Sequence, residues 1–139
     1  VTITRVTVTR PEDEKTTEMG RKQIIPYGLY RVEGYVSAKL ANDSTKGTGF
    51  SEEDVELLWT ALMNMFDYDH SASHGKMAAQ KLFIFKHNNE LGNAPANQLF
   101  DVITISKKDE KNAPRSFSDY SVFVDKNRIP DGVSLIERL

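Results

Sequence analysis

Hydrophobic and polar positions alternate along the first part of the chain. Residues 1–9 (VTITRVTVT) are rich in β-branched side chains and predict a strand. The alternation breaks near Arg5, which predicts a bulge. Residues 10–22 are polar and contain proline and glycine, so we expect them to form a loop.

A second alternating run, over residues 24–40, predicts a long strand. Pro26 has no N–H to donate, so it should lie at the start of this strand or on an edge. Aromatic rings interleave with charges along the run, as at Tyr27, Tyr30 and Arg31. Such a strand either has one solvated face or forms a platform that binds a polyanion.

A helix is predicted from Ser51. Ser51 and Asp54 approximate a capping box, and the acidic first turn suits the positive end of the helix dipole. We expect one face of this helix to be buried, with Trp59 in the core. The apolar positions with helical spacing are Val55, Leu58, Trp59, Leu62, Met65 and Phe66.

The second half of the chain predicts short elements that alternate with loops. The order β-β-α-β-(short α)-β-β predicts an α+β fold, in which one principal helix packs on a mostly antiparallel sheet, as in ferredoxin-like and RNA-recognition-like palms. The predicted elements are a central strand at 81–86, a short helix from Pro95 to Phe100, strands at 102–106 and 119–124, and an extended tail.

Composition narrows the classes of protein. A chain of 139 residues suggests one domain. It has no cysteine, which excludes disulfides and thiolate metal sites and fits a reducing compartment, so we expect a cytoplasmic protein. No apolar run reaches the roughly 18 residues needed to span a bilayer. The run of alternation from Val1 suggests that the chain begins inside a larger protein.

The net charge of −2 hides an uneven distribution. Residues 51–75 hold six acidic residues and no lysine or arginine, so the remainder has 18 basic and 14 acidic residues, a net +4. Lysine and arginine beside glycine or aromatic residues suit contacts with phosphate and bases, but the same residues also occur in ordinary solvated hairpins. The main basic groups are Arg10, Lys15, Arg21 and Lys22, then Lys76 and Lys81, then Lys107, Lys108, Lys111 and Arg115.

A metal site is one candidate for chemistry. The segment DYDHSASH offers Asp67, Asp69, His70 and His74, and two histidines four residues apart can ligate zinc on a helix. The segment follows the predicted helix, however, and no glutamate stands beside the first histidine. A polar helix end is therefore the alternative, and we predict no metal and no cofactor.

Several blocks match a known family in order along nearly the whole chain. These blocks are MGRKQIIPYGLYRVEGYVSA, TGFSEEDVELLW, HGKMAAQKLFIFKH, LGNAPANQLFDVI and RSFSDYSVFVD. They resemble the CRISPR-associated backbone subunit of type I-C Cascade, one of the Csd-type RAMP proteins. Members of that family are longer, so the resemblance implies that this chain corresponds to the C-terminal half.

The resemblance implies a non-catalytic function. Family subunits polymerise along a guide RNA, each palm holds the RNA backbone, and a thumb hairpin displaces one base at regular intervals while target DNA pairs with the exposed bases. It therefore implies as partners the guide RNA (crRNA), target DNA through that RNA, other copies of the subunit and other Cascade subunits, with no membrane.

Within this chain, residues 10–22 would be the thumb-like hairpin. Met19 would wedge against a base, while Arg21 and Lys22 would neutralise phosphates. The candidate RNA-binding residues are Arg10, Met19, Arg21, Lys22, Tyr27, Arg31, Lys46, Lys76 and Arg115.

Two other functions remain open from the sequence. One is a metal-dependent ribonuclease that uses the Asp67–His74 segment, and the other is a protein-interaction module whose acidic helix, with Glu52 and Glu56, meets a basic partner. A half-length chain would also leave an unpaired sheet edge, so we predict self-association through edge pairing or exchange of the first strand.

Overall fold

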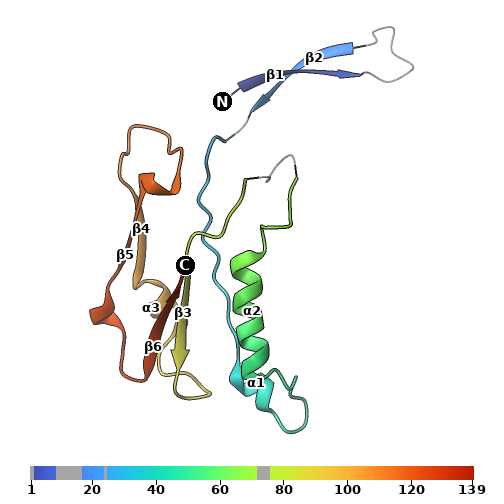
Figure 1. Ribbon diagram of the computed structural model, residues 1–139. Coiled ribbons are helices and arrows are strands. Elements are labelled where there is room, and N and C mark those ends of the chain that lie inside the picture. Colours follow the sequence, from blue (N-terminus) through green and yellow to red (C-terminus); the bar gives the residue numbers. More distant parts are fainter. Residues whose placement is uncertain (1, 9–16, 24, 72–75) are drawn as a thin grey trace. The chain divides into compact units, whose positions relative to one another are not determined.

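The structure of the chain is a computed structural model, in which residues 2–8, 17–23, 25–71 and 76–139 are described (Figure 1). The chain divides into two compact units. Unit 1 comprises Val1–Arg31 and Ser106–Ser121, and unit 2 comprises Val32–Ile105 and Val122–Leu139.

Unit 1 contains an antiparallel hairpin of β1 (Thr2–Val8) and β2 (Thr17–Gln23). The prediction of β1 is confirmed. The predicted bulge is wrong, since Arg5 pairs with Gly20 in an unbroken register. The predicted loop is also wrong over 17–22, because β2 forms there. Backbone groups of β1 need partners whatever side chains the returning segment carries, so a polar segment can complete the hairpin.

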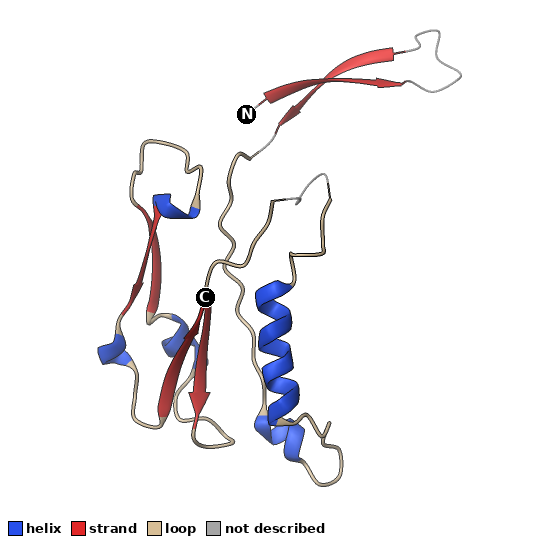
Figure 2. Ribbon diagram, in the orientation of Figure 1, coloured by secondary structure: helices blue, strands red, loops and turns tan. Residues whose placement is uncertain are grey.

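The long strand predicted over 24–40 is absent from the described residues, which is a correction to the sequence analysis. Residues 25–37 form no regular element, and the short helix α1 (Ala38–Asn42) follows them (Figure 2). Ser37 caps α1, because its Oγ accepts a hydrogen bond from the Leu40 N–H at 3.3 Å. Alternation describes which faces of a segment are apolar, but a strand also needs a neighbour that completes its hydrogen bonds.

Helix α2 (Glu52–Asn64) in unit 2 begins as predicted. Ser51 Oγ accepts from the Asp54 N–H at 3.2 Å, and Asp54 Oδ2 accepts from the Ser51 N–H at 2.8 Å, which confirms the capping box. The predicted buried face is only partly covered, because no residue of α2 is buried and Trp59 is half-buried. The expectation that Trp59 lies in the core is therefore wrong.

Beside α2, unit 2 contains an antiparallel sheet of β3 (Leu82–His87) and β6 (Val133–Arg138). The predicted central position of β3 is wrong for the described residues, since β6 is its one strand partner there. The predicted short helix is confirmed as α3 (Ala96–Phe100), with Pro95 at its N-cap. The buried hydrophobic residues of the described chain are Ile84, Leu99, Val102 and Ile103.

The last two predicted strands pair as a hairpin of β4 (Ile103–Lys107) and β5 (Tyr120–Val124), with a short 3-10 turn on each side of β5 (Phe117–Asp119 and Lys126–Arg128). The fold is therefore α+β, with few helices and mostly antiparallel pairing, as predicted. The described strands form three two-stranded sheets. No helix in the described ranges is long and apolar enough to cross a bilayer.

Candidate nucleic-acid interface

The loop between β4 and β5 carries the most exposed positive charge of unit 1 among the residues whose side chains are described. We call residues 107–119 the basic loop. Within the described chain, no ion pair involves Lys107, Lys111 or Arg115, so these cations are available to an outside anion. The four cations of the basic loop are all exposed: Lys107, Lys108, Lys111 and Arg115.

Two carboxylates give the basic loop its shape. Asp109 accepts hydrogen bonds from the Lys111 N–H at 2.8 Å and the Asn112 side-chain amide at 2.7 Å. Asp119 accepts from the N–H groups of Arg115 at 2.8 Å and Ser116 at 3.0 Å. Hydrogen bonds to the ionised form lower the pKa of both carboxyls, led by the Asn112 amide at Asp109 and by the Arg115 N–H at Asp119.

These carboxylates also limit the local charge. The basic loop holds four cations and three acidic residues, a net charge of +1. Asp109 and Asp119 accept hydrogen bonds from backbone N–H groups of the basic loop, whereas the side chains of its four cations are exposed. An anion-binding role must therefore come from the position of the cations and not from the net charge.

A tyrosine pair lies in the same unit. The rings of Tyr27 and Tyr120 are 6.2 Å apart and tilted by 41°, and both side chains are half-buried. Burial raises the pKa of the Tyr27 phenol, and Tyr120 and Asp119 raise it further, so Tyr27 stays protonated. Tyr27 thus packs against Tyr120 of β5, whereas the side chain of Tyr30 is 73% exposed.

The candidate residues of the predicted thumb are only partly described. Arg10 lies outside the described residues. On β2, Met19 pairs with Val6, Arg21 with Thr4 and Lys22 with Ile3. Unit 1 therefore brings Met19, Arg21, Lys22, Tyr27, Arg31 and Arg115 into one compact body.

The remaining candidates belong to unit 2. Lys46 is exposed in a turn, where its backbone N–H donates to Asp43 at 2.8 Å, and Lys76 is exposed next to the undescribed residues 72–75. The predicted set is thus divided between the two units. Sequence reasoning did not identify Tyr120, because nothing local indicates that it meets Tyr27 across the chain.

The proposed metal ligands do not form a cluster among the described residues. Asp67 and Asp69 follow α2 in a turn and an irregular segment, and His74 lies outside the described residues. Of the described side chains, no three histidines or carboxylates lie close enough to hold a metal ion. The ribonuclease hypothesis, which needs His74, is therefore not tested by this structure.

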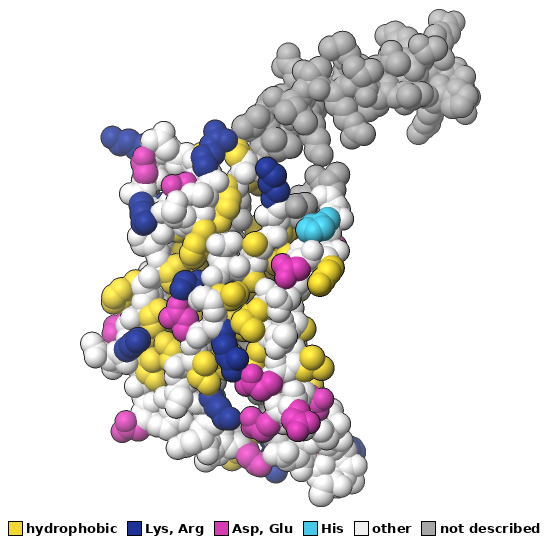
Figure 3. All heavy atoms as spheres, in the orientation of Figure 1, with side chains coloured by type: hydrophobic (Ala, Val, Ile, Leu, Met, Phe, Trp, Pro, Cys, Tyr) yellow, Lys and Arg dark blue, Asp and Glu magenta, His cyan; other side chains and the backbone are white. Residues whose placement is uncertain are grey.

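Acidic side chains gather over α2 (Figure 3). Two of them are already paired within unit 2. Glu52 meets Lys86 of β3 at 3.2 Å, and both carboxylate oxygens of Glu56 accept from Arg138 of β6, at 2.9 and 3.0 Å. These partly exposed ion pairs join α2 to the β3–β6 sheet and occupy two of the acidic side chains that a basic partner would contact.

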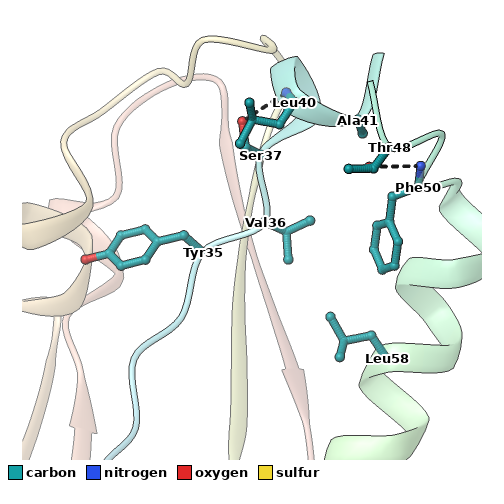
Figure 4. Close-up of a pocket in the computed structure, with 8 residues that line it drawn as sticks. All are labelled: Tyr35, Val36, Ser37, Leu40, Ala41, Thr48, Phe50 and Leu58. Atoms are coloured by element: carbon teal, nitrogen blue, oxygen red, sulfur yellow. Dashed lines mark hydrogen bonds between the residues drawn. The ribbon is translucent and has the colours of Figure 1, made fainter. Parts of the chain in front are cut away.

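A cavity of about 420 Å³ lies on unit 2 between α1, α2 and the segment before α1. Val36, Phe50 and Leu58 point toward one another across it, whereas Tyr35 points away (Figure 4), with its ring on Phe100 at 5.6 Å. The hydroxyls of Ser37 and Thr48 in its lining accept hydrogen bonds from backbone N–H groups. The cavity therefore offers mainly apolar contact and no charged group.

A comparison of the sequence with known protein families finds a match that includes the whole of unit 1. The model of the family described as CRISPR-associated protein Cas7 matches residues 1–125. The match includes the β1–β2 hairpin, the tyrosine pair and the whole basic loop. No curated protein matches the chain. Because the match covers most of its length, the chain belongs to the CRISPR-associated protein Cas7 family.

Proposed function

We propose that this chain is a crRNA-binding, non-catalytic part of the backbone subunit of a type I CRISPR interference complex, with the Csd-type subunit of type I-C Cascade as its specific relative. The observation that carries the proposal is the basic loop. It presents four exposed cations within the range matched by the family, next to a tyrosine pair.

Exposed lysine and arginine contact phosphates without regard to base sequence. A subunit that covers a guide RNA needs this property, because sequence recognition is left to base pairing with the target. The loop's own hydrogen bonds at Asp109 and Asp119 fix its backbone before RNA arrives, which lowers the entropy lost on binding.

The candidate residues take separate roles in this proposal. Residues 10–22 form the thumb-like hairpin, in which Arg10, Arg21 and Lys22 contact phosphates and Met19 wedges against a base. Tyr27 supports β5, Arg31 and Arg115 contact the RNA backbone, and Lys46 and Lys76 give a second, weaker contact from unit 2. The partners are guide RNA, target DNA through it, other copies and other Cascade subunits in the cytoplasm.

The test compares two double variants that remove the same charge. Lys111→Gln with Arg115→Gln removes two cations of the basic loop, and Lys39→Gln with Lys126→Gln removes two exposed cations of unit 2. Binding to a labelled single-stranded RNA is measured by fluorescence anisotropy across a salt series. If both loop cations contact phosphates, the loop variant reduces the slope of log K against log salt by about 1.4, at ~0.7 per contact.

The control variant should leave that slope unchanged. Equal slopes for the two variants would refute a role for the basic loop in RNA binding, because the loop and the control sites would then act only through net charge. The RNA should also remain intact during prolonged incubation with divalent metal. Cleavage sensitive to a chelator would instead favour the ribonuclease hypothesis.

A further inference from the structure

Helix α2 carries apolar side chains on two faces. One face lies toward the β3–β6 sheet, because two glutamates of α2 form ion pairs with cations of β3 and β6. With about 3.6 residues per turn, Leu57, Ala61 and Met65 fall roughly on the opposite side of the helix. We call these three residues the outer stripe, which lies wholly within unit 2.

The outer stripe is open to solvent. Leu57 is 68% exposed, Met65 is 50% exposed, and Ala61 between them is also exposed. A single exposed leucine is ordinary, but residues four apart on a helix have Cβ atoms about 5–6 Å apart and are neighbours on its surface. The outer stripe is therefore a continuous apolar ridge, and an exposed apolar surface with polar edges is typical of a protein contact site.

The polar groups beside the outer stripe are satisfied by the helix itself. Thr60 Oγ1 donates a hydrogen bond to the Glu56 carbonyl at 2.9 Å, and Asn64 Nδ2 donates to the Thr60 carbonyl at 2.7 Å. A partner that covers this flank therefore leaves these donors with their acceptors. This arrangement keeps the desolvation cost of binding low.

An acidic side chain stands at each end of the outer stripe. Glu53 lies one turn before Leu57, and Asp67 lies in the turn that follows Met65. Both acids are exposed, and within the described chain neither side chain has an ion pair or a hydrogen bond. Residues 51–75 contain six acidic residues and no lysine or arginine, so no cation of this segment offsets these charges.

We propose that the outer stripe binds a basic amphipathic helix of a protein partner. Large apolar side chains of the partner pack on Leu57 and Met65, and the small Ala61 between them lets one of these side chains approach α2 closely. Lysine or arginine at each end of the partner's apolar face pairs with Glu53 and Asp67. These two acids are roughly 20 Å apart along α2, so the matching cations lie about four turns apart on the partner helix.

Charge complementarity selects this occupant over two others. If α2 of a second copy covered the outer stripe, two segments with six acidic residues and no cation would meet, and like charges oppose such an association. A nucleic acid would be repelled for the same reason. A helix with basic flanks is instead attracted by these acids, which also speed its approach.

The contact should be weak and transient. From Leu57 to Met65 the outer stripe extends about 12 Å, so a partner helix buries less than the roughly 1,200 Å² of a standard interface. An interface of this size suits a partner that binds and dissociates readily. The proposal concerns unit 2 and a protein partner, and it does not rest on RNA binding by the basic loop of unit 1.

A synthetic peptide provides the probe. It contains only leucine and lysine, placed so that leucine covers one face of a helix, and a second peptide has glutamate in place of lysine. The full chain is titrated into each fluorescently labelled peptide while anisotropy is recorded. The lysine peptide should bind with a dissociation constant at least about tenfold below that of the glutamate peptide. NMR amide shifts should change mainly along α2, at Leu57, Ala61 and Met65.

A paired substitution tests the outer stripe itself. Leu57→Gln with Met65→Gln should raise the dissociation constant of the lysine peptide about tenfold or more. The matched control is Ile25→Gln with Leu91→Gln, at apolar side chains that are 78% and 83% exposed outside α2, and it should leave that constant unchanged. Circular dichroism checks that each variant is folded.

A charge reversal tests the acidic ends. Glu53→Lys should raise the dissociation constant of the lysine peptide about threefold or more, because it replaces an attraction with a repulsion. Asp131→Lys makes the same change at an exposed acid outside α2 and should have no such effect.

The proposal is overturned if the two peptides bind equally, or if the outer-stripe variant binds the lysine peptide as tightly as its control does. It is also overturned if the amide shifts change outside α2, because the peptide would then occupy another surface. Sedimentation tests the remaining occupant. A dimer of the unaltered chain that Leu57→Gln with Met65→Gln dissociates would identify a second copy as the occupant and overturn the proposal.

Discussion

Shortening Leu99 to alanine should destabilise unit 2 strongly. Leu99 is 2% exposed and is one of the few buried hydrophobic side chains of the described chain, beside Val102 and Ile103 in sequence. Leu→Ala changes in protein cores cost about 2–5 kcal/mol. Because no residue of α2 is buried and the core is small, neighbours can relax into part of the space, so we expect a loss of about 2–3 kcal/mol in the free energy of unfolding.

Urea denaturation followed by tryptophan fluorescence measures this loss. The chain has one tryptophan, Trp59, which belongs to unit 2 and therefore reports on that unit alone. Leu91→Ala is the matched control, because Leu91 is 83% exposed and its truncation should change stability by no more than about 0.5 kcal/mol. Equal urea midpoints for the two variants would refute the position of the core around Leu99.

Two further predictions concern α2. Hydrogen bonds from the Ser51 backbone and hydroxyl lower the pKa of the Asp54 carboxyl, so its ionised form favours the folded state. That contribution to stability should be present above the unfolded pKa of about 3.9, and it should be lost as pH falls through the lower pKa of Asp54 in the folded state. The urea midpoint of Asp54→Asn should therefore decline less at acid pH than that of the unaltered chain. An identical decline in the two proteins would contradict the capping role of Asp54. A double-mutant cycle with Glu56→Gln and Arg138→Met should give a coupling free energy below about 1 kcal/mol that decreases in high salt, because both side chains are partly exposed. A larger coupling free energy would indicate that the pair is buried.

Much of the fold follows from local signals in the sequence. The capping box at Ser51 fixes the start of α2, and Pro95 marks the start of α3. The short β-rich runs later in the chain correspond to β3, β4, β5 and β6. In each case the residues that specify the element lie within it or next to it.

The elements and contacts that the sequence did not predict correctly share a different physical cause. Residues 25–37 have the pattern of a strand, yet a strand depends on a partner that the pattern does not encode. β2 has a polar, glycine-containing sequence but forms because β1 provides that partner. The contact between Tyr27 and Tyr120 joins positions far apart in the chain, so no local signal predicts it.

The candidate site shows why net charge is a poor guide to binding in this protein. Lys86 and Arg138 are committed to the acidic helix, and Lys81 pairs with Glu137, so these cations stabilise unit 2 and are not fully available to a ligand. The cations of the basic loop have no such ion pairs within the described chain, although the chain as a whole has a net charge of −2. The electrostatic potential at a binding site depends mainly on the charges near that site and not on the net charge of the whole molecule. A protein with a negative net charge can therefore still present a local group of exposed cations, as the basic loop does with Lys107, Lys108, Lys111 and Arg115.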